Sequence, residues 1–89
     1  PQDYAKARQW YEKAAAQGHA DSQNNLGSLY YNGVGVSQDY AKARQWYEKA
    51  AAQGHADSQH NLGSLYQNGD GIPQDYAKAR QWYEKAAAQ

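Results

Sequence analysis

Hydrophobic positions along the chain fall at helical spacing. In residues 3–17, aromatic side chains and alanines share one broad face, and lysine and glutamine occupy the opposite face. In residues 19–32, a second stripe at the same spacing consists of Ser22, Leu26, Leu29 and Tyr30. No segment shows the alternation expected of a half-buried strand. The pattern therefore predicts two kinds of helix, which we call B helices (as in 3–17) and A helices (as in 19–32).

Both kinds of helix recur with a period of 36 residues. Residues 2–17 and 74–89 are identical to residues 38–53, and residues 18–36 differ from 54–72 at four of nineteen positions. A fixed period of this length is typical of stacked repeats, in which each unit buries its apolar face against its neighbours. We therefore expect an all-α superhelical solenoid with the helix order B-A-B-A-B. It would form a single repeat array over residues 1–89, with one B helix in 1–18 and an A and a B helix in each of 19–54 and 55–89.

Helix boundaries are marked by residues with local roles. Asp3 can accept a hydrogen bond from the first turn of a B helix, and Gly18 can adopt the left-handed conformation that ends one. Gly33 and Gly35 form a turn after the A helix. Gly27 lies inside the A helix, where glycine costs roughly 1 kcal/mol relative to alanine. We therefore expect another helix to cross closely at Gly27.

Composition argues against several partners. Nine basic and nine acidic side chains recur together in every repeat, so there is no basic stripe for a nucleic acid. The chain has no cysteine, which excludes disulfides, thiolate nucleophiles and cysteine-based zinc sites. No apolar run is long enough for a membrane span or a signal peptide. We expect neither nucleic acid nor a membrane as a partner, and the chain ends suggest an excised or engineered segment.

The repeated motifs resemble those of the Sel-one-like repeat (SLR) family, a relative of the tetratricopeptide repeat. The resemblance covers the whole chain and rests on LGSLY in 26–30, NGVGV in 32–36, DYAKA in 39–43, Trp46-Tyr47 and AAAQG in 50–54. It implies a right-handed α/α solenoid whose A helices line a concave surface, used as a non-catalytic adaptor or scaffold for protein assemblies. One bacterial branch carries a disulfide in each repeat, and this chain departs from that branch. Ser22 and Ser58 stand where the family commonly has alanine. The identity between copies fits either a consensus-type engineered array or a recent tandem duplication.

Candidate catalytic and metal-binding residues have simpler interpretations. His19 and His55 recur one period apart, but helix capping explains them and no second ligand lies at helical spacing in both copies. Asp57, Ser58 and His60 are the residue types of a hydrolase triad, yet they share one helical turn and cannot converge from separate elements. We expect an i,i+3 contact between Asp57 and His60 instead.

Two glycine-rich turns also suggest binding loops at first. Residues 68–72, NGDGI, lack the carboxylates that a calcium loop requires at its first and last positions. No strand precedes these glycines and no GK[ST] follows, which excludes a phosphate loop. We therefore expect no metal, no cofactor and no enzymatic activity.

The aromatic residues are interpreted as core. Nine of the twelve tyrosines and tryptophans lie in the B helices, on or beside the apolar face. Trp46 lies in the central B helix and is expected to be more buried than Trp10 or Trp82. A stacking platform for bases or sugars is the less favoured alternative.

Differences between the two A helices predict a binding surface. Asn24 becomes His60 and Tyr31 becomes Gln67, and both positions lie away from the buried stripe. We expect this face to bind a protein or an extended peptide, with Tyr31 as the aromatic anchor. The alternative is a structural array with no ligand of its own. The same apolar residues recur in the terminal B helices, so end-to-end self-association is also expected. The predicted binding residues are Asn24, Ser28, Tyr31, His60, Ser64 and Gln67.

Overall fold

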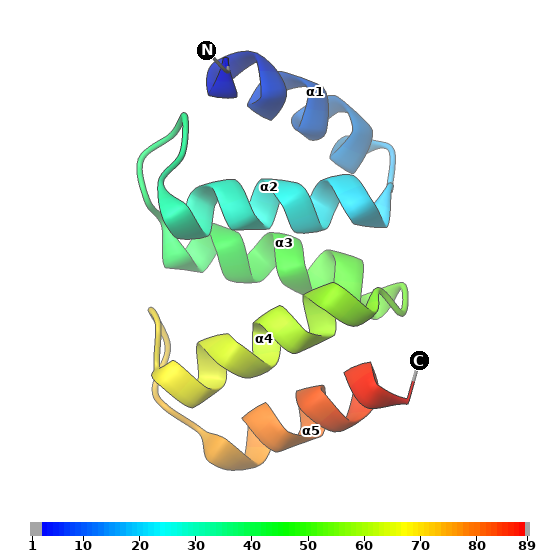
Figure 1. Cartoon of the computed structure of the whole chain (residues 1–89), viewed down its shortest axis with the longest axis vertical. Helices are drawn as coiled ribbons and strands as arrows, with labels where there is room; N and C mark the ends of the chain where they lie inside the picture. The colour runs from blue at the N-terminus through cyan, green and yellow to red at the C-terminus, as the bar shows by residue number, and fades with distance from the viewer. Residues whose placement is uncertain (1–2, 89) are drawn as a thin grey trace.

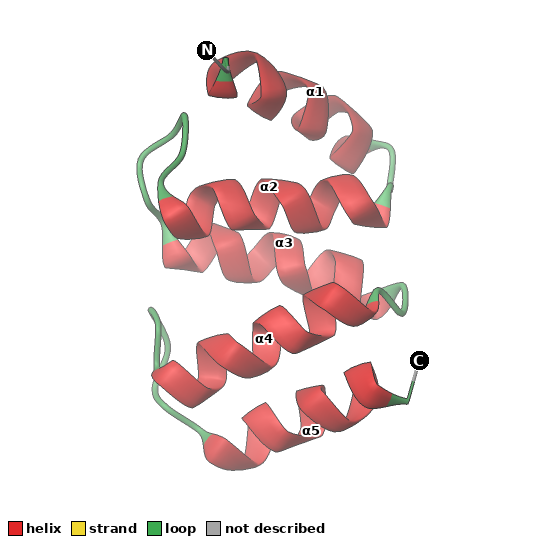
Figure 2. Ribbon diagram, in the orientation of Figure 1, coloured by secondary structure: helices red, strands yellow, loops and turns green. Residues whose placement is uncertain are grey.

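Five helices of similar length form the whole of the secondary structure that the computed structural model describes, over residues 3–88. Consecutive helices run antiparallel and stack along the longest dimension of the molecule, which measures 38 Å (Figure 1). Only helices and short loops are present in this range (Figure 2). The all-α repeat solenoid predicted from the sequence is thereby confirmed. The helices are α1 (Tyr4–Ala16), α2 (Ala20–Asn32), α3 (Tyr40–Ala52), α4 (Ala56–Asn68) and α5 (Tyr76–Ala87).

Helix ends follow the predicted capping residues. Asp3 accepts a hydrogen bond from the backbone N–H of Lys6, and Asp39 and Asp75 repeat this bond in α3 and α5 at 3.0 Å. The A helices, α2 and α4, end in glycines with left-handed backbone conformation. None of the helices described here is long and apolar enough to cross a membrane.

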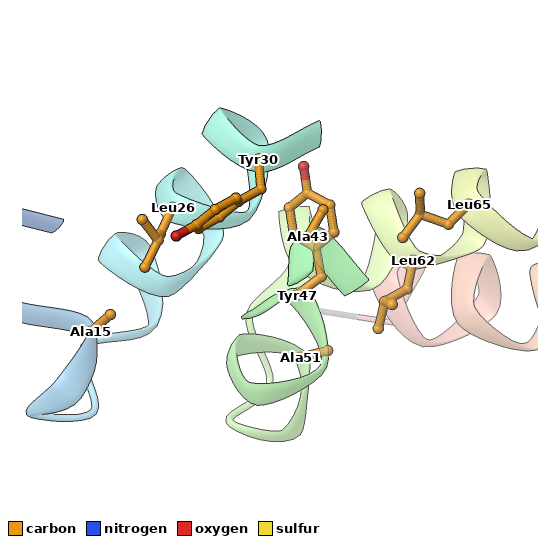
Figure 3. Packing of buried hydrophobic residues seen from close by; sticks show 8 residues of the cluster. All are labelled: Ala15, Leu26, Tyr30, Ala43, Tyr47, Ala51, Leu62 and Leu65. Atoms are coloured by element: carbon orange, nitrogen blue, oxygen red, sulfur yellow. The ribbon is translucent and has the colours of Figure 1, made fainter. Parts of the chain in front are cut away.

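The core runs through the middle of the stack. Leu26 and Tyr30 of α2 and Leu62 of α4 are buried, as the stripe predicted (Figure 3). Tyr66, the copy of Tyr30 in α4, is buried as well. Leu65 is also buried, whereas its copy Leu29 is only half-buried. Leu29 lines an open pocket together with residues of the terminal helix α1, which leaves its side chain partly accessible. The central helices therefore provide most of the buried apolar surface.

A close helix crossing at Gly27 is confirmed. A Cβ atom at this position would lie 2.8 Å from two ring carbons of Tyr47 and 3.2 Å from the carbonyl oxygen of Ala43. Gly63 is in the same relation to Tyr83, with the nearest ring carbon at 2.6 Å. In each repeat the glycine thus provides the space in which a B-helix tyrosine lies across the A helix.

The three tryptophans differ in burial. Trp10 is 69% exposed, and both Trp46 and Trp82 are half-buried. The Nζ atom of Lys49 lies 4.7 Å from the ring centroid of Trp46, so this ring is covered partly by a flexible charged side chain. The buried B-helix aromatic is instead Tyr47, only 4% exposed. The prediction that Trp46 is more buried than Trp10 is therefore confirmed, although Trp46 is only half-buried and packs at the edge of the core, as Trp82 does.

Two buried glutamines were not predicted. The side-chain amide of Gln23 donates to the carbonyl oxygen of Ala15 at 3.1 Å, and Gln59 donates to that of Ala51 at 3.2 Å. Both acceptors lie in the last turn of a B helix, where carbonyl groups lack a partner within the helix. These bonds join each A helix to the end of the B helix before it.

Candidate functional site

A polar pocket lies where α2, α3 and α4 meet. Its volume is about 250 Å³, and every side chain that lines it ends in a hydroxyl or an amide group. Three of the lining residues belong to the predicted binding set. The lining residues are Ser28, Tyr31 and Asn32 of α2, Tyr47 of α3, and Asn61 and Ser64 of α4.

Tyr47 reaches the pocket from the core. Its ring lies in the space left by Gly27, and its hydroxyl forms a 2.9 Å hydrogen bond with the hydroxyl of Ser28. Burial of the ring raises the pKa of Tyr47, an effect that the hydrogen bond between its hydroxyl and that of Ser28 partly opposes. The phenol is therefore neutral at physiological pH, and the pocket wall carries both a donor and an acceptor at this point.

Tyr31 is held from two sides at the edge of the pocket. Its hydroxyl donates a 2.7 Å hydrogen bond to the carboxylate of Asp70, which follows α4 in the next repeat. Its ring packs against that of Tyr40, with centroids 5.1 Å apart and planes inclined by 51°. The hydrogen bond to Asp70, with burial as a second cause, raises the pKa of Tyr31 to about 12. The neutral phenol thus bridges two repeats.

The bond between Tyr31 and Asp70 predicts late ionisation of one tyrosine. The folded pKa of about 12 lies above the ordinary value of 10.0, so the stabilisation that the neutral phenol provides is fully present below pH 10. It is lost as the pH rises toward 12. Because burial also raises the pKa of Tyr47, we expect ultraviolet titration of tyrosinate to show a late component that Tyr31→Phe reduces by the contribution of one tyrosine. An unchanged titration curve in that variant would contradict the assignment.

Asn24 has a structural role between the A helices. Its side-chain oxygen accepts hydrogen bonds from the Oγ atom of Ser58 at 2.8 Å and from the side-chain amide of Asn61 at 3.0 Å. Ser58 is completely buried, and without this acceptor its hydroxyl would keep only the Nδ1 atom of His55, at 3.0 Å, as a partner. Asn24 therefore joins α2 to α4, and its replacement by alanine is expected to lower stability.

His60 and Gln67 lie beside Tyr83 of α5, away from the pocket. The ring centroids of His60 and Tyr83 are 5.1 Å apart, and the hydroxyl of Tyr83 donates to the side-chain oxygen of Gln67 at 2.7 Å. The hydroxyls of Tyr83 and Ser64 are also within hydrogen-bond distance, at 3.1 Å. The structure thus brings Ser28, Tyr31 and Ser64 to one pocket and places the other predicted residues elsewhere.

The comparison between the two A helices did not indicate three of the six residues that line the pocket. Asn32, Tyr47 and Asn61 have identical copies one period away, so a search for differing positions passes over them. The glycine inside the A helix is the one signal that indicates Tyr47, because it shows that something large lies across that helix. Nothing in the sequence distinguishes Asn32 from its copy Asn68.

The two histidines that precede the A helices, His19 and His55, differ in whether they cap the helix. The Nδ1 atom of His55 accepts a hydrogen bond from the backbone N–H of Ser58, so Nε2 carries the proton and donates to Asp21 at 2.7 Å. His19 makes no side-chain capping bond, although it occupies the same position before α2. Over residues 3–88 no three acidic or histidine side chains are close enough together to hold a metal ion. His60 packs on Tyr83 and has no ion pair with Asp57.

Known structures share this architecture. The chain matches a protective antigen of uropathogenic Escherichia coli that has an SLR fold, with a TM-score of 0.97 and 48% identity over 100% of this chain and 19% of the antigen. A Sel1 repeat protein of Oxalobacter formigenes gives a TM-score of 0.92 and 43% identity, over 99% of this chain and 36% of that protein. For Helicobacter pylori cysteine rich protein B the TM-score is 0.86 and the identity 31%, over 91% of this chain and 61% of the other.

The chain thus spans between a fifth and three-fifths of the length of these structures. No curated protein sequence matches it. The sequence profile of the Sel1 repeat matches residues 1–19, 20–55 and 56–89, which together make up the entire chain. The LGSLY and DYAKA motifs, the close crossing at each A-helix glycine and the stacked helices agree with that match. The protein therefore belongs to the Sel1 repeat family.

Proposed function

We propose that this chain is a non-catalytic scaffold module that binds an extended peptide or a protein on the face formed by its A helices. The observation that supports this proposal is the pocket between α2, α3 and α4, which is open, polar and uncharged. Helical repeats of this family generally mediate protein–protein interactions. The proposed binding face comprises the predicted residues, Asn24, Ser28, Tyr31, His60, Ser64 and Gln67, together with Asn32 and Asn61.

The chemistry of the pocket suits a peptide backbone. Hydroxyl and amide groups donate and accept hydrogen bonds, as the N–H and C=O groups of an extended chain require. Tyr31 provides an aromatic surface at the rim, and its raised pKa keeps it neutral. A strongly charged ligand would find no opposite charge among the residues that line the pocket. We therefore expect neutral peptide segments with small or polar side chains to bind best.

A structural array without a ligand is the second candidate. It is favoured by the hydrogen bonds that the A-helix face already makes within the molecule. Asn24 joins α2 to α4, Tyr31 joins α2 to Asp70, and Gln67 joins α4 to Tyr83. In this second interpretation the polar residues determine the register between repeats, and the pocket is a consequence of their packing.

Peptide binding tests the proposal with a closely matched pair of variants. A peptide array probed with the purified chain would identify a binding segment, and its affinity would then be measured for Asn32→Ala and Asn68→Ala. Both asparagines are exposed and end an A helix, but only Asn32 lines the pocket. Because one hydrogen bond contributes about 0.5–1.5 kcal/mol, we expect Asn32→Ala to weaken binding by roughly threefold to tenfold.

Asn68→Ala is expected to leave the affinity unchanged. An array on which no peptide is retained would favour the structural role instead. If Asn32→Ala and Asn68→Ala weakened peptide binding equally, the pocket would not be the binding site. A loss of binding on replacing Lys42 or Lys49 would move the site to the B-helix face, where these side chains cover the rings of Tyr30 and Trp46.

A further inference from the structure

The last helix leaves an open groove at one end of the stack. The groove has a volume of about 500 Å³ and combines alanines with the ring of Tyr83. The groove is lined by residues of α4 and α5. The lining residues are Ala56, Asp57 and His60 of α4, and Tyr83, Ala86 and Ala87 of α5.

The same surface is covered one repeat earlier. Ala50 and Ala51 of α3 are buried, while their copies Ala86 and Ala87 in α5 are half-buried and exposed. The helix that covers the first pair is α4, whose Gln59 bonds to Ala51. The chain itself therefore shows that the occupant suited to the groove is an A helix.

The contacts of that covering helix define what a new occupant must provide. The start of α4 approaches α2 with three polar side chains: His55 bonds to Asp21, and Ser58 and Asn61 bond to Asn24. At the open end, Asp57 and His60 occupy the positions of the two acceptors, Asp21 and Asn24. A neutral imidazole can accept a hydrogen bond as the amide oxygen does.

The matching helix is present in the same chain, at its other end. In α2 the three positions are occupied by His19, Ser22 and Asn25, and the structure of residues 3–88 shows no hydrogen bond from these side chains. Ser22 is only half-buried and Asn25 is exposed, because α2 is the first A helix within residues 3–88. The two ends of the molecule thus carry complementary halves of one interface.

One helix blocks direct joining of these two halves. The place in front of α2 is filled by α1, whose thirteen residues are identical to residues 76–88. If α2 of one molecule joins α5 of another, α5 must therefore take the place of α1. We propose that the groove on α4 and α5 binds α2 of a second copy of this chain, with α1 of that copy displaced in a domain swap.

The contacts of the two helices determine which one leaves. Tyr83 of α5 lies over Gly63 and hydrogen-bonds to Ser64 and Gln67. In the described part of the chain α1 is the first helix, and its corresponding residue Tyr11 has no such glycine or serine of an A helix beside it there. Since α5 keeps these bonds in the swapped state, α1 is the helix that dissociates.

The junction also covers an exposed aromatic ring. Tyr76, at the start of α5, is 67% exposed. Its copy Tyr40 lies against the turn at Gly71, where a Cβ atom would be 2.6 Å from the Cβ of Tyr40. In the swapped dimer the turn at Gly35 of the second copy would cover Tyr76 in the same way. The exchange preserves the contacts that α1 made, because α5 has the same sequence, and it adds those between the A helices.

Two alanine variants test the groove. Ala87→Arg places a large charged side chain where the covered copy, Ala51, is buried, whereas Ala88→Arg alters a position whose copy, Ala52, is exposed. The full chain would be incubated up to millimolar concentration a few degrees below its unfolding midpoint, since exchange requires α1 to dissociate. Light scattering after size exclusion then measures the association.

We expect dimers and longer assemblies for the unchanged chain and for Ala88→Arg, and at least tenfold weaker association for Ala87→Arg at an equal unfolding midpoint. A strictly monomeric unchanged chain, or equal association of the two variants, would overturn the proposal. Amide exchange by nuclear magnetic resonance distinguishes the swap from simple end-to-end stacking. The swap predicts that protection is lost at α1 and gained at α5 in the assembly, whereas a gain at both helices would show stacking without displacement.

Discussion

Replacement of Tyr47 by alanine is expected to lower the free energy of unfolding by about 3–5 kcal/mol. The ring is 4% exposed, lies against Gly27, and belongs to the central B helix, so its removal leaves a cavity between α2 and α3. A chain of 89 residues is held by roughly 4–13 kcal/mol in total, so this loss is a large part of the whole stability. Urea denaturation followed by circular dichroism measures the loss.

Copies of Tyr47 in the outer B helices provide the matched controls. Tyr11 and Tyr83 are half-buried in α1 and α5, so their replacement by alanine should cost less than that of Tyr47. Trp46→Ala should also be milder, because the indole is only half-buried. Tyr47→Phe keeps the ring and loses the bond to Ser28, at a cost of about 0.5–1.5 kcal/mol. Equal losses for Tyr11, Tyr47 and Tyr83 would contradict the stacked core.

Local signals in the sequence were sufficient for the helices and their order. Capping by Asp3 and helix termination at Gly33 depend only on neighbouring residues, and both occur as expected. Leu26 and Tyr30 of the predicted A-helix stripe are buried, because a narrow apolar stripe determines which side of the helix faces the core. Gly27 indicated a close crossing, since a glycine inside a helix needs a compensating contact.

The sequence did not show in the same way which aromatic residue of the B helix is buried. Its apolar face is broad and holds Trp46 beside Tyr47, and helical spacing alone does not show which of the two points at the neighbouring helix. The tyrosine is buried because it fits the space left by Gly27, which is a property of two helices together. The buried Gln23 has the same origin, because its partner is a carbonyl group of another helix.

The candidate site also depends on a contact between repeats that the sequence alone did not show. Two of the four differences between the repeats lie at positions 31 and 34 of the first copy. Across the repeats they are linked, because Tyr31 of one copy donates to Asp70, which replaces Val34 in the next. A contact between residues 39 apart in sequence requires the stacking geometry, so only the structure could show that these two differences form one interaction.

The second large effect is expected at Gly71, in the turn that carries Asp70. Its φ of 69° costs alanine about 1–2 kcal/mol. The added Cβ would also lie 2.6 Å from the Cβ of Tyr40, a clash that a rotation of the ring cannot relieve. With about 1–3 kcal/mol for overpacking, Gly71→Ala should lower the free energy of unfolding by about 2–5 kcal/mol, as measured by urea denaturation.

Gly69→Ala separates the two causes. This residue has the same φ of 69° in the same turn, but an added Cβ atom would lie 3.3 Å from its nearest neighbour, the Cβ of Gln74, a contact that a small shift relieves. We expect a loss of only about 1–2 kcal/mol there, and equal losses at the two glycines would disprove the contact with Tyr40. Because Tyr40 packs on Tyr31, Gly71→Ala should also disturb the bond from Tyr31 to Asp70. The pKa of Tyr31 should then fall from about 12 toward its ordinary value, whereas Gly69→Ala should leave it unchanged.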